Sequence, residues 1–276
     1  MKLLLSRSAI HYPVSLLLAC LVMPATLGAE EPYQLRVLCY NIHYGQGTDG
    51  RYDIPRLANV IRETKPDLVA LQEVDVGVAR SSRVHEAREL GRLTKMAVRF
   101  GPTQHYDGGL YGNAVLSCLP IEDVHIQPLP YSESDQQRTT YPRGAIALTV
   151  RLQTQQLIRF ISTHFQHNVE DDRVAEATAI CEHFAGEDRL PSILAGDMNA
   201  KPDSEPIAIL TKHWLHGSQE PFEPTAPSEK PTSRIDYIFY QARTGLRLIE
   251  SRVIDEPIAS DHRPVLSVFE YSNRGE

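Results

Sequence analysis

The chain has 276 residues, of which 42% are hydrophobic and 23% are charged, and this length fits one large globular domain or two small ones. Its net charge of −7 at pH 7 argues against a protein that grips nucleic acid nonspecifically, because an acidic surface does not attract phosphate polyanions at long range. No Gly-, Ser- or Pro-rich linker is long enough to divide the chain, so we expect a single domain over residues 30–276.

The first 29 residues have the pattern of a secretory signal peptide. Lys2 and Arg7 precede an apolar stretch over residues 14–23, and small residues follow up to Ala29. The apolar stretch is short for a membrane span, so we expect cleavage after Ala29 and a secreted or periplasmic protein. The minor alternative is a lipoprotein anchored through Cys20, which the residues around that cysteine fit poorly.

Strand patterns outnumber helix patterns in the rest of the chain. Strands are expected over residues 35–40, 68–71, 96–100, 113–117, 121–127, 145–152, 157–163, 192–195, 235–240, 246–254 and 265–269. Helices are expected between Asp53 and Pro66 and over 84–93, 171–184 and 203–213. The segments 128–142 and 215–233 lack a clear period and are expected to be functional loops. This order of elements predicts a strand-rich, layered α/β fold.

Three cysteines would remain after removal of the signal peptide. Cys39, Cys118 and Cys181 each lie in an apolar stretch, so we expect buried thiols. A single bridge between Cys39 and Cys118 is the alternative.

Several apolar runs are followed directly by side chains that bind hard metal ions. These are Asn41 and His43, Glu73, Asp197 and Asn199, and Asp261 and His262. Buried strands deliver their ends to the rim of a sheet, so these groups should emerge together. Carboxylate and amide oxygens suit Mg²⁺, with Mn²⁺ or Ca²⁺ as alternatives, and the pattern therefore indicates a divalent-metal hydrolytic site.

Six short motifs, taken in order, resemble the endonuclease/exonuclease/phosphatase superfamily. They are Asn41, Leu71-Gln72-Glu73, Ser162-Thr163-His164, Gly196-Asp197-Met198-Asn199, Arg234-Ile235-Asp236-Tyr237-Ile238 and Ser260-Asp261-His262. The resemblance spans residues 34–271 and makes residues 30–276 a catalytic domain. It implies a four-layer αββα sandwich, in which two packed, mostly antiparallel sheets are flanked by helices.

The resemblance also implies roles in the hydrolysis of a phosphate ester. That reaction needs positive charge at the phosphoryl oxygens, an activated water and a proton for the leaving oxygen. Glu73 would bind the metal, with Asn41 and Asp261 helping to hold the metal and its waters. Asp197 would orient or deprotonate the attacking water, and Asn199 would donate its amide N–H to a phosphoryl oxygen.

Two histidines complete the implied machinery. His262 would act on the phosphate or the water, with Asp236 accepting its other ring proton and fixing the tautomer. An acid within an apolar strand, as Asp236 is, is costly unless it is paired. His164 would face the substrate from the opposite sheet as a phosphate donor or general acid.

Further residues are candidates for contact with the substrate. Arg143 could clamp a phosphate by two hydrogen bonds, or could be a solvated loop arginine. His43, Tyr111, Asn113 and His167 could line the same edge. The segments 41–45 and 163–167 resemble a bacterial secreted subgroup related to proteins that remodel glycosylphosphatidylinositol lipids.

Taken together, these features predict a monomeric, metal-dependent phosphoesterase acting on a phosphodiester, either a lipid headgroup or a small organic molecule. A secreted nonspecific nuclease is the alternative, although Lys/Arg clusters are few and the charge is negative. A phosphomonoesterase for sugar or inositol phosphates is a third option. A catalytically inactive binding module of the same fold would be expected to lack a metal carboxylate or the paired acid and histidine, and all of these are present.

Overall fold

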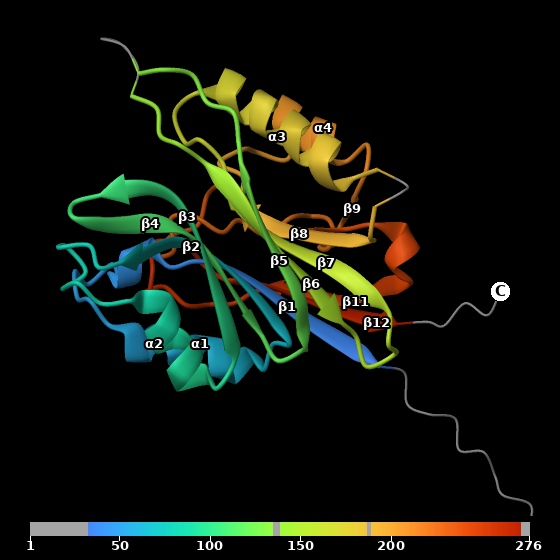
Figure 1. Cartoon of the computed structure of the whole chain (residues 1–276), viewed down its shortest axis with the longest axis horizontal. Helices are drawn as coiled ribbons and strands as arrows, with labels where there is room; N and C mark the ends of the chain where they lie inside the picture. The colour runs from blue at the N-terminus through green and yellow to red at the C-terminus, as the bar shows by residue number, and fades with distance from the viewer. Residues whose placement is uncertain (1–32, 135–138, 187–188, 272–276) are drawn as a thin grey trace, which may run out of the picture. The chain divides into compact units, whose positions relative to one another are not determined.

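The computed structural model describes residues 33–134, 139–186 and 189–271, and the expected signal peptide lies outside this part of the chain. Within it, twelve strands form two six-stranded sheets that pack face to face (Figure 1). Each sheet is mixed: β1 and β2 are parallel in the first, β7 and β8 are parallel in the second, and the other neighbours are antiparallel.

The first sheet has the strand order β11-β12-β1-β2-β4-β3. Its strands are β1 (Gln34–Asn41), β2 (Leu68–Val76), β3 (Ala97–Tyr106), β4 (Gly109–Ser117), β11 (Leu246–Val253) and β12 (Val265–Tyr271). Helices α1 (Ile54–Thr64) and α2 (Glu86–Thr94) cover its outer face, and the short helix η1 (His43–Gly45) follows β1.

The second sheet has the order β5-β6-β7-β8-β10-β9. Its strands are β5 (Ile121–Pro128), β6 (Gly144–Arg151), β7 (Leu157–His164), β8 (Ser192–Asp197), β9 (Leu215–His216) and β10 (Asp236–Tyr240). Helices α3 (Glu170–Phe184) and α4 (Glu205–Leu210) cover its outer face, and η2 (Ala242–Thr244) links β10 to β11. The predicted αββα sandwich is therefore confirmed.

Three layers of apolar side chains hold the sandwich together. The central layer lies between the sheets and includes Val37 of β1, Val115 of β4 and Phe160 of β7, all with no exposed surface. The outer layers pack α1 and α2 on one sheet and α3 and α4 on the other. A buried hydrogen bond, from Nε2 of Gln72 on β2 to Oγ of Ser162 on β7, joins the sheets near the ends of these strands.

Helix α1 illustrates how closely the local sequence sets an element. The carboxylate of Asp53 accepts a hydrogen bond of 2.9 Å from the backbone N–H of Arg56, and Pro55 occupies the first turn. Leu57 and Ile61 lie on the buried face. The helix ends at Thr64, before Pro66, as the sequence predicts.

Two expectations need correction. Cys118 is exposed rather than buried, because it follows the last residue of β4, whereas Cys39 and Cys181 are buried as expected. All three are free thiols, so the alternative bridge between Cys39 and Cys118 is not formed. The segment 215–233 also contains the two-residue strand β9. Among the helices of the described chain, none is long and apolar enough to cross a membrane.

Candidate active site

The two parallel strand pairs bring polar residues from both sheets to one edge of the sandwich. On β1 and β2, Asn41 pairs in register with Gln72, directly before Glu73. On β7 and β8, His164 pairs with Asp197. Gly196 allows the second pair to approach, since a Cβ at this position would lie 2.3 Å from the carbonyl oxygen of Thr163. These facing strand ends form the floor of the site.

A β-bulge in β2 sets the direction of Glu73. The pairing of β2 with β4 shifts between Leu71 and Val74, so that Gln72 and Glu73 together face the single residue Asn113. Glu73 has a positive φ of 58°, in the left-handed region that a non-glycine residue rarely adopts. The bulge breaks the alternation of the strand just where its carboxylate reaches the site.

Asn41 holds two of the carboxylates. Its Nδ2 donates to Oε1 of Glu73 and to Oδ2 of Asp197, both at 3.0 Å. Its Oδ1 accepts the backbone N–H of His43 at 3.0 Å, which fixes the amide orientation. Asn41 has no exposed surface, so these bonds are shielded from solvent.

Asp197 lies at the centre of the cluster. Its Oδ1 accepts the backbone N–H of Asn199 at 2.9 Å, while Oδ2 lies 3.5 Å from Nε2 of His164 and 3.7 Å from Nε2 of His262. Burial, followed by the nearby charge of Asp236, raises the pKa of Asp197 to about 7. A carboxyl group with this pKa can both accept and release a proton near neutral pH.

Asp236 and His262 form the pair that the sequence predicts. Nδ1 of His262 lies 2.9 Å from Oδ2 of Asp236, and Asp236 is fully buried in β10. Since the carboxylate accepts the Nδ1 proton, Nε2 is left to face Asp197. Burial disfavours the charged ring, but the carboxylates of Asp236 and Asp197 outweigh it and raise the pKa of His262 well above its ordinary value.

Arg143 fixes the tautomer of His164. Nη1 of Arg143 lies 3.2 Å from Nδ1 of His164, and because a guanidinium can only donate, Nδ1 must accept and the ring proton must sit on Nε2. Burial and the charge of Arg143 lower the pKa of His164 well below its ordinary value, so the ring is neutral. Arg143 is 6% exposed, which excludes the alternative of a solvated loop arginine.

Asn199 lies beside this histidine. Its Nδ2 donates to the carbonyl oxygen of Phe165 at 3.0 Å and lies 3.0 Å from Nε2 of His164. Both nitrogens carry hydrogen in the tautomer that Arg143 imposes, so the second contact is not a hydrogen bond.

The remaining predicted residues lie close to the site but outside the pocket wall. Nδ1 of His43 lies 3.1 Å from the carbonyl oxygen of Gln46, which can only accept, so Nδ1 carries the ring proton and donates it. The same nitrogen lies 3.8 Å from Oδ1 of Asp261. Asn113 donates its Nδ2 to the carbonyl oxygen of Gly144 at 2.8 Å and therefore joins the first sheet to the second at the first residue of β6, directly after Arg143.

Two groups of side chains can be considered for a metal ion. Asp197, Asp236 and His262 each offer one ligand atom, and these atoms lie within 4.8 Å of one another. In that group, however, Nδ1 of His262 and Oδ2 of Asp236 are already bonded to each other. Glu73 and Asp261 are the second candidates, since Asn41 donates to Glu73 and its backbone carbonyl oxygen accepts the hydroxyl of Ser260, the neighbour of Asp261. Their carboxylate oxygens suit a hard divalent cation.

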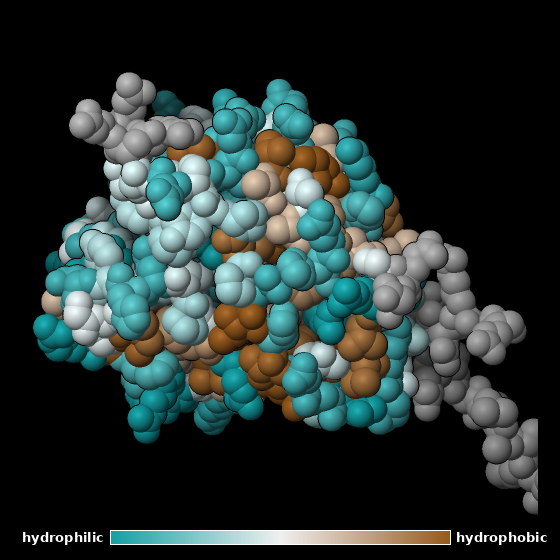
Figure 2. All heavy atoms as spheres, turned by 45° about the horizontal axis from the view of Figure 1, so that its top comes forward, coloured by the Kyte–Doolittle hydropathy of each residue, from teal (hydrophilic) through white to brown (hydrophobic). Residues whose placement is uncertain are grey.

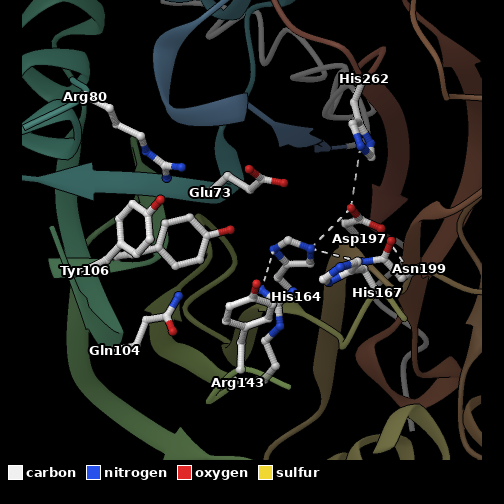
Figure 3. Close-up of a pocket in the computed structure, with 12 residues that line it drawn as sticks. Glu73, Arg80, Gln104, Tyr106, Arg143, His164, His167, Asp197, Asn199 and His262 are labelled. Atoms are coloured by element: carbon white, nitrogen blue, oxygen red, sulfur yellow. Dashed lines mark hydrogen bonds and ion pairs between the residues drawn. The ribbon is translucent and has the colours of Figure 1, made fainter. Parts of the chain in front are cut away.

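A pocket of about 350 Å³ opens over this edge (Figure 3). The predicted residues that line it are Glu73, Tyr111, Arg143, His164, His167, Asp197, Asn199 and His262. Sequence reasoning missed a further part of the wall, which consists of Arg80, Gln104, Tyr106 and Tyr141. These residues lie in loops and in an exposed hairpin, where no apolar period or acidic motif marks them.

Comparisons with known proteins find relatives of this chain. The Endonuclease/Exonuclease/phosphatase family model matches residues 38–262. The uncharacterized protein YbhP of Escherichia coli is 26% identical over 256 residues, which cover 85% of this chain and 96% of that protein.

Solved structures share the fold. A mannosyl-6-phosphatase of Bacteroides thetaiotaomicron has a TM-score of 0.67 and 18% identity, covering 84% of this chain and 98% of its own. The catalytic domain of human Nocturnin has a TM-score of 0.65 and 19% identity, covering 87% of this chain and 95% of its own. With the αββα sandwich and a family match over most of its length, this chain belongs to the endonuclease/exonuclease/phosphatase family.

Proposed function

We propose that this chain is a divalent-metal-dependent phosphoesterase that hydrolyses a phosphodiester. The observation that carries the proposal is the convergence of three side chains on Oδ2 of Asp197. Asn41 reaches it from the first sheet at 3.0 Å, His164 lies 3.5 Å away on β7, and His262 lies 3.7 Å away on the segment before β12. A buried carboxylate set among such groups can position a water molecule and take its proton.

The metal would be held by Glu73 and Asp261, with Asn41 fixing the Glu73 carboxylate. Mg²⁺ suits these oxygens best, with Mn²⁺ and Ca²⁺ as alternatives. When bound, such an ion supplies positive charge at the phosphoryl oxygens. Asp261 is about half exposed, with 45% of its side chain accessible, so it remains within reach of a solvated ion.

Protein side chains would transfer the proton and bind the phosphate. The water oxygen bonds to phosphorus while the bond from phosphorus to the leaving oxygen breaks. Asp197 accepts the proton that the water loses, and the leaving oxygen takes up a proton from solvent. His164, with its proton on Nε2, and Asn199 would donate hydrogen bonds to the phosphate. His262 would act on the phosphate or the water in the orientation that Asp236 gives it.

A small substrate is favoured over nucleic acid. The pocket is of a size that holds a small molecule, and the net charge of −7 gives no long-range attraction for a polyanion. On the face drawn in Figure 2, hydrophobic residues form separate groups among hydrophilic ones. From the pocket size and the net charge, we favour the polar headgroup of a lipid, or a small organic phosphodiester, as the group bound in the pocket. The narrower resemblance to lipid-remodelling relatives stays a prediction.

A phosphomonoester is the second candidate. The observation in its favour is the shared fold with an enzyme named as a mannosyl-6-phosphatase. The two candidates differ in whether the phosphate carries one or two ester bonds, so the same side chains could serve both reactions.

The proposal is tested by assaying the purified protein against bis(4-nitrophenyl) phosphate, 4-nitrophenyl phosphate, DNA and RNA. Each assay is run with Mg²⁺, Mn²⁺ or Ca²⁺ and again with EDTA. We expect metal-dependent hydrolysis of the diester. The variant Asp197→Asn should lose at least about a hundredfold in kcat, whereas the control Asp203→Asn, an exposed carboxylate on the surface, should not. Equal rates for Asp197→Asn and wild type, or no hydrolysis of any ester, would refute the proposal.

A further inference from the structure

One end of the pocket has no part in the proposed hydrolysis. Arg80, Gln104 and Tyr106 line the same cavity as Asp197 and His262. Figure 3 shows these three side chains together on one side of the cavity, across Glu73 from Asp197 and His262. They come from the loop after β2 and from β3, so they are supplied by the first sheet alone.

Arg80 is held rigidly in this wall. Its Nε and Nη2 donate to the two carboxylate oxygens of Asp75 at 2.8 and 3.0 Å, and Asp75 is fully buried. The guanidinium also lies 3.7 Å from the ring centre of Tyr44 and 4.6 Å from that of Tyr106. This packing fixes the plane of the guanidinium, while Nη1 forms no bond to Asp75 and can serve a ligand.

Gln104 and Tyr106 add polar atoms to the same wall. They lie two residues apart on β3, so their side chains leave the strand on the same face. Among the described residues, neither the Gln104 amide nor the Tyr106 hydroxyl forms a hydrogen bond. Tyr106 is 41% exposed, so part of its ring is also open. The wall thus combines a flat apolar surface with donors and acceptors of fixed direction.

We propose that Arg80, Gln104 and Tyr106 form a subsite for a hydroxylated ring, a sugar or a cyclitol, that carries the scissile phosphate. The inference rests on the proposed function, which places the phosphate among Asp197 and the two histidines. Ring hydroxyls would pair with Nη1 of Arg80 and with the Gln104 amide, and the C–H face of the ring would pack on Tyr106.

The charge balance favours hydroxyls over a second anionic group. The charge of Arg80 is matched by the buried carboxylate of Asp75. A further phosphate or carboxylate would therefore meet little net positive charge, whereas a neutral hydroxyl can both donate and accept. A cavity of about 350 Å³ is also near the lower limit for ligand pockets, which suits a single ring with its phosphate.

The subsite is tested by titration calorimetry with myo-inositol 1-phosphate, glucose 6-phosphate, adenosine 5′-monophosphate and inorganic phosphate, each in the presence of Mg²⁺. The proteins are wild type, Gln104→Ala and Tyr106→Ala. The matched control is His105→Ala, since His105 is exposed between the two test positions and does not line the cavity. Both test positions are on the surface of a hairpin, and thermal melting checks that each variant folds.

We expect at least one ring phosphate to bind wild type at least about tenfold more tightly than inorganic phosphate, a difference of about 1.4 kcal/mol. Gln104→Ala and Tyr106→Ala should remove this advantage without changing the affinity for inorganic phosphate, and His105→Ala should retain it.

Equal affinity for the ring phosphates and inorganic phosphate would overturn the subsite while leaving the phosphoesterase proposal intact. A preference for adenosine 5′-monophosphate over both ring phosphates would also overturn it, in favour of a subsite that stacks a base. If no phosphate compound binds and no ester is hydrolysed, the proposed function fails as well.

A free sugar or cyclitol phosphate and a lipid headgroup share this ring chemistry. A second arm separates them by measuring hydrolysis of phosphatidylinositol in phosphatidylcholine vesicles, and of soluble glycerophosphoinositol. If phosphatidylinositol in vesicles is hydrolysed faster than the soluble ester, and Gln104→Ala and Tyr106→Ala lower that rate, the lipid is the source of the ring. If glycerophosphoinositol is hydrolysed faster, and the same two variants lower that rate, the soluble compound is the source of the ring. Turnover of both that is insensitive to the two variants contradicts the subsite.

Discussion

Oδ2 of Asp197 lies 3.0 Å from Nδ2 of Asn41, although the two residues are 156 positions apart in the chain and belong to different sheets. Neither sheet holds the complete site. The first supplies Asn41 and Glu73, and the second supplies His164, Asp197 and, through β10, the partner of His262. The distances within the site therefore depend on how the two sheets pack against each other.

Shortening a side chain between the sheets should lower stability. Phe160 is fully buried in the central layer, so Phe160→Ala should reduce the free energy of unfolding by about 3–5 kcal/mol through lost burial and the cavity left behind. Urea unfolding measures this change. Tyr131→Ala removes an aromatic ring that is 48% exposed and should cost far less. Equal losses in the two variants would contradict the assignment of the central layer.

Removing the carboxylate of Glu73 should weaken metal binding. Glu73→Ala should raise the Kd for Mn²⁺ at least about tenfold, because a charged oxygen ligand is lost. Calorimetry measures the affinity directly, without any assay of activity, and circular dichroism checks the fold. The control is Glu63→Ala, an exposed acid at the end of α1. A Kd unchanged by Glu73→Ala would exclude Glu73 as a ligand.

Neutralising Asp236 should slow the reaction while sparing the metal. In Asp236→Asn the group that accepts the Nδ1 proton of His262 loses its charge, and the orientation of the ring is no longer enforced. We expect kcat to fall by at least about a hundredfold, with the Kd for Mn²⁺ unchanged. Asp171→Asn, an exposed change on α3, serves as the control. An unaltered kcat in Asp236→Asn would show that the pairing has no role in turnover.

A buried acid behind the site should make stability depend on pH. Glu176 is fully buried on α3 and accepts the backbone N–H of Gln166 at 2.8 Å, and burial raises the pKa of its carboxyl from 4.5 to about 8. Between these values the folded protein binds the proton and the unfolded chain releases it. Stability must therefore fall as pH rises from about 4.5 to 8 and should change no further above that range.

Glu176→Gln provides the test, since the amide stays neutral and can still accept the Gln166 N–H. We expect the variant to gain stability relative to wild type as pH rises from 5 to 8, by an amount of the order of a few kcal/mol, at about 1.4 kcal/mol for each tenfold change in proton affinity. Urea unfolding at several pH values measures the difference. Glu182→Gln, an exposed neighbour on α3, should show no such trend. A constant difference between Glu176→Gln and wild type would refute the role of Glu176.

Much of the fold could be predicted from the sequence because its strands are apolar and its breaks are marked. The run that became β8 is buried throughout and that of β1 is buried from Val37 to Asn41, and Asp53 and Pro66 bound α1 through local chemistry. The extension of β3 to Tyr106 was missed because its second half is polar and exposed, and pairing with β4 holds it in the sheet. The local sequence pattern does not show such pairing between strands.

Some residues of the site could likewise be predicted from the sequence and others could not. Acids at strand ends could be found from the sequence because a charged group beside an apolar run is unusual, and Asp236 is the clearest case. Arg80 and Gln104 could not be found in this way, because both are common surface residue types. Only their position in the wall of the cavity marks them as candidates. The exposure of Cys118 was missed for a related reason, since an apolar neighbourhood in the chain does not determine which side of a strand end faces solvent.

The bulge in β2 has a consequence for how this chain can diverge. Gln72 and Glu73 together face the single residue Asn113, and this extra residue gives the Glu73 carboxylate its direction. An evolving sequence can exchange the side chains of β2 one at a time and keep that geometry. Gain or loss of one amino acid at this point would leave a sheet that still forms but no longer serves the reaction, so selection acts here on the length of the strand as well as on its composition.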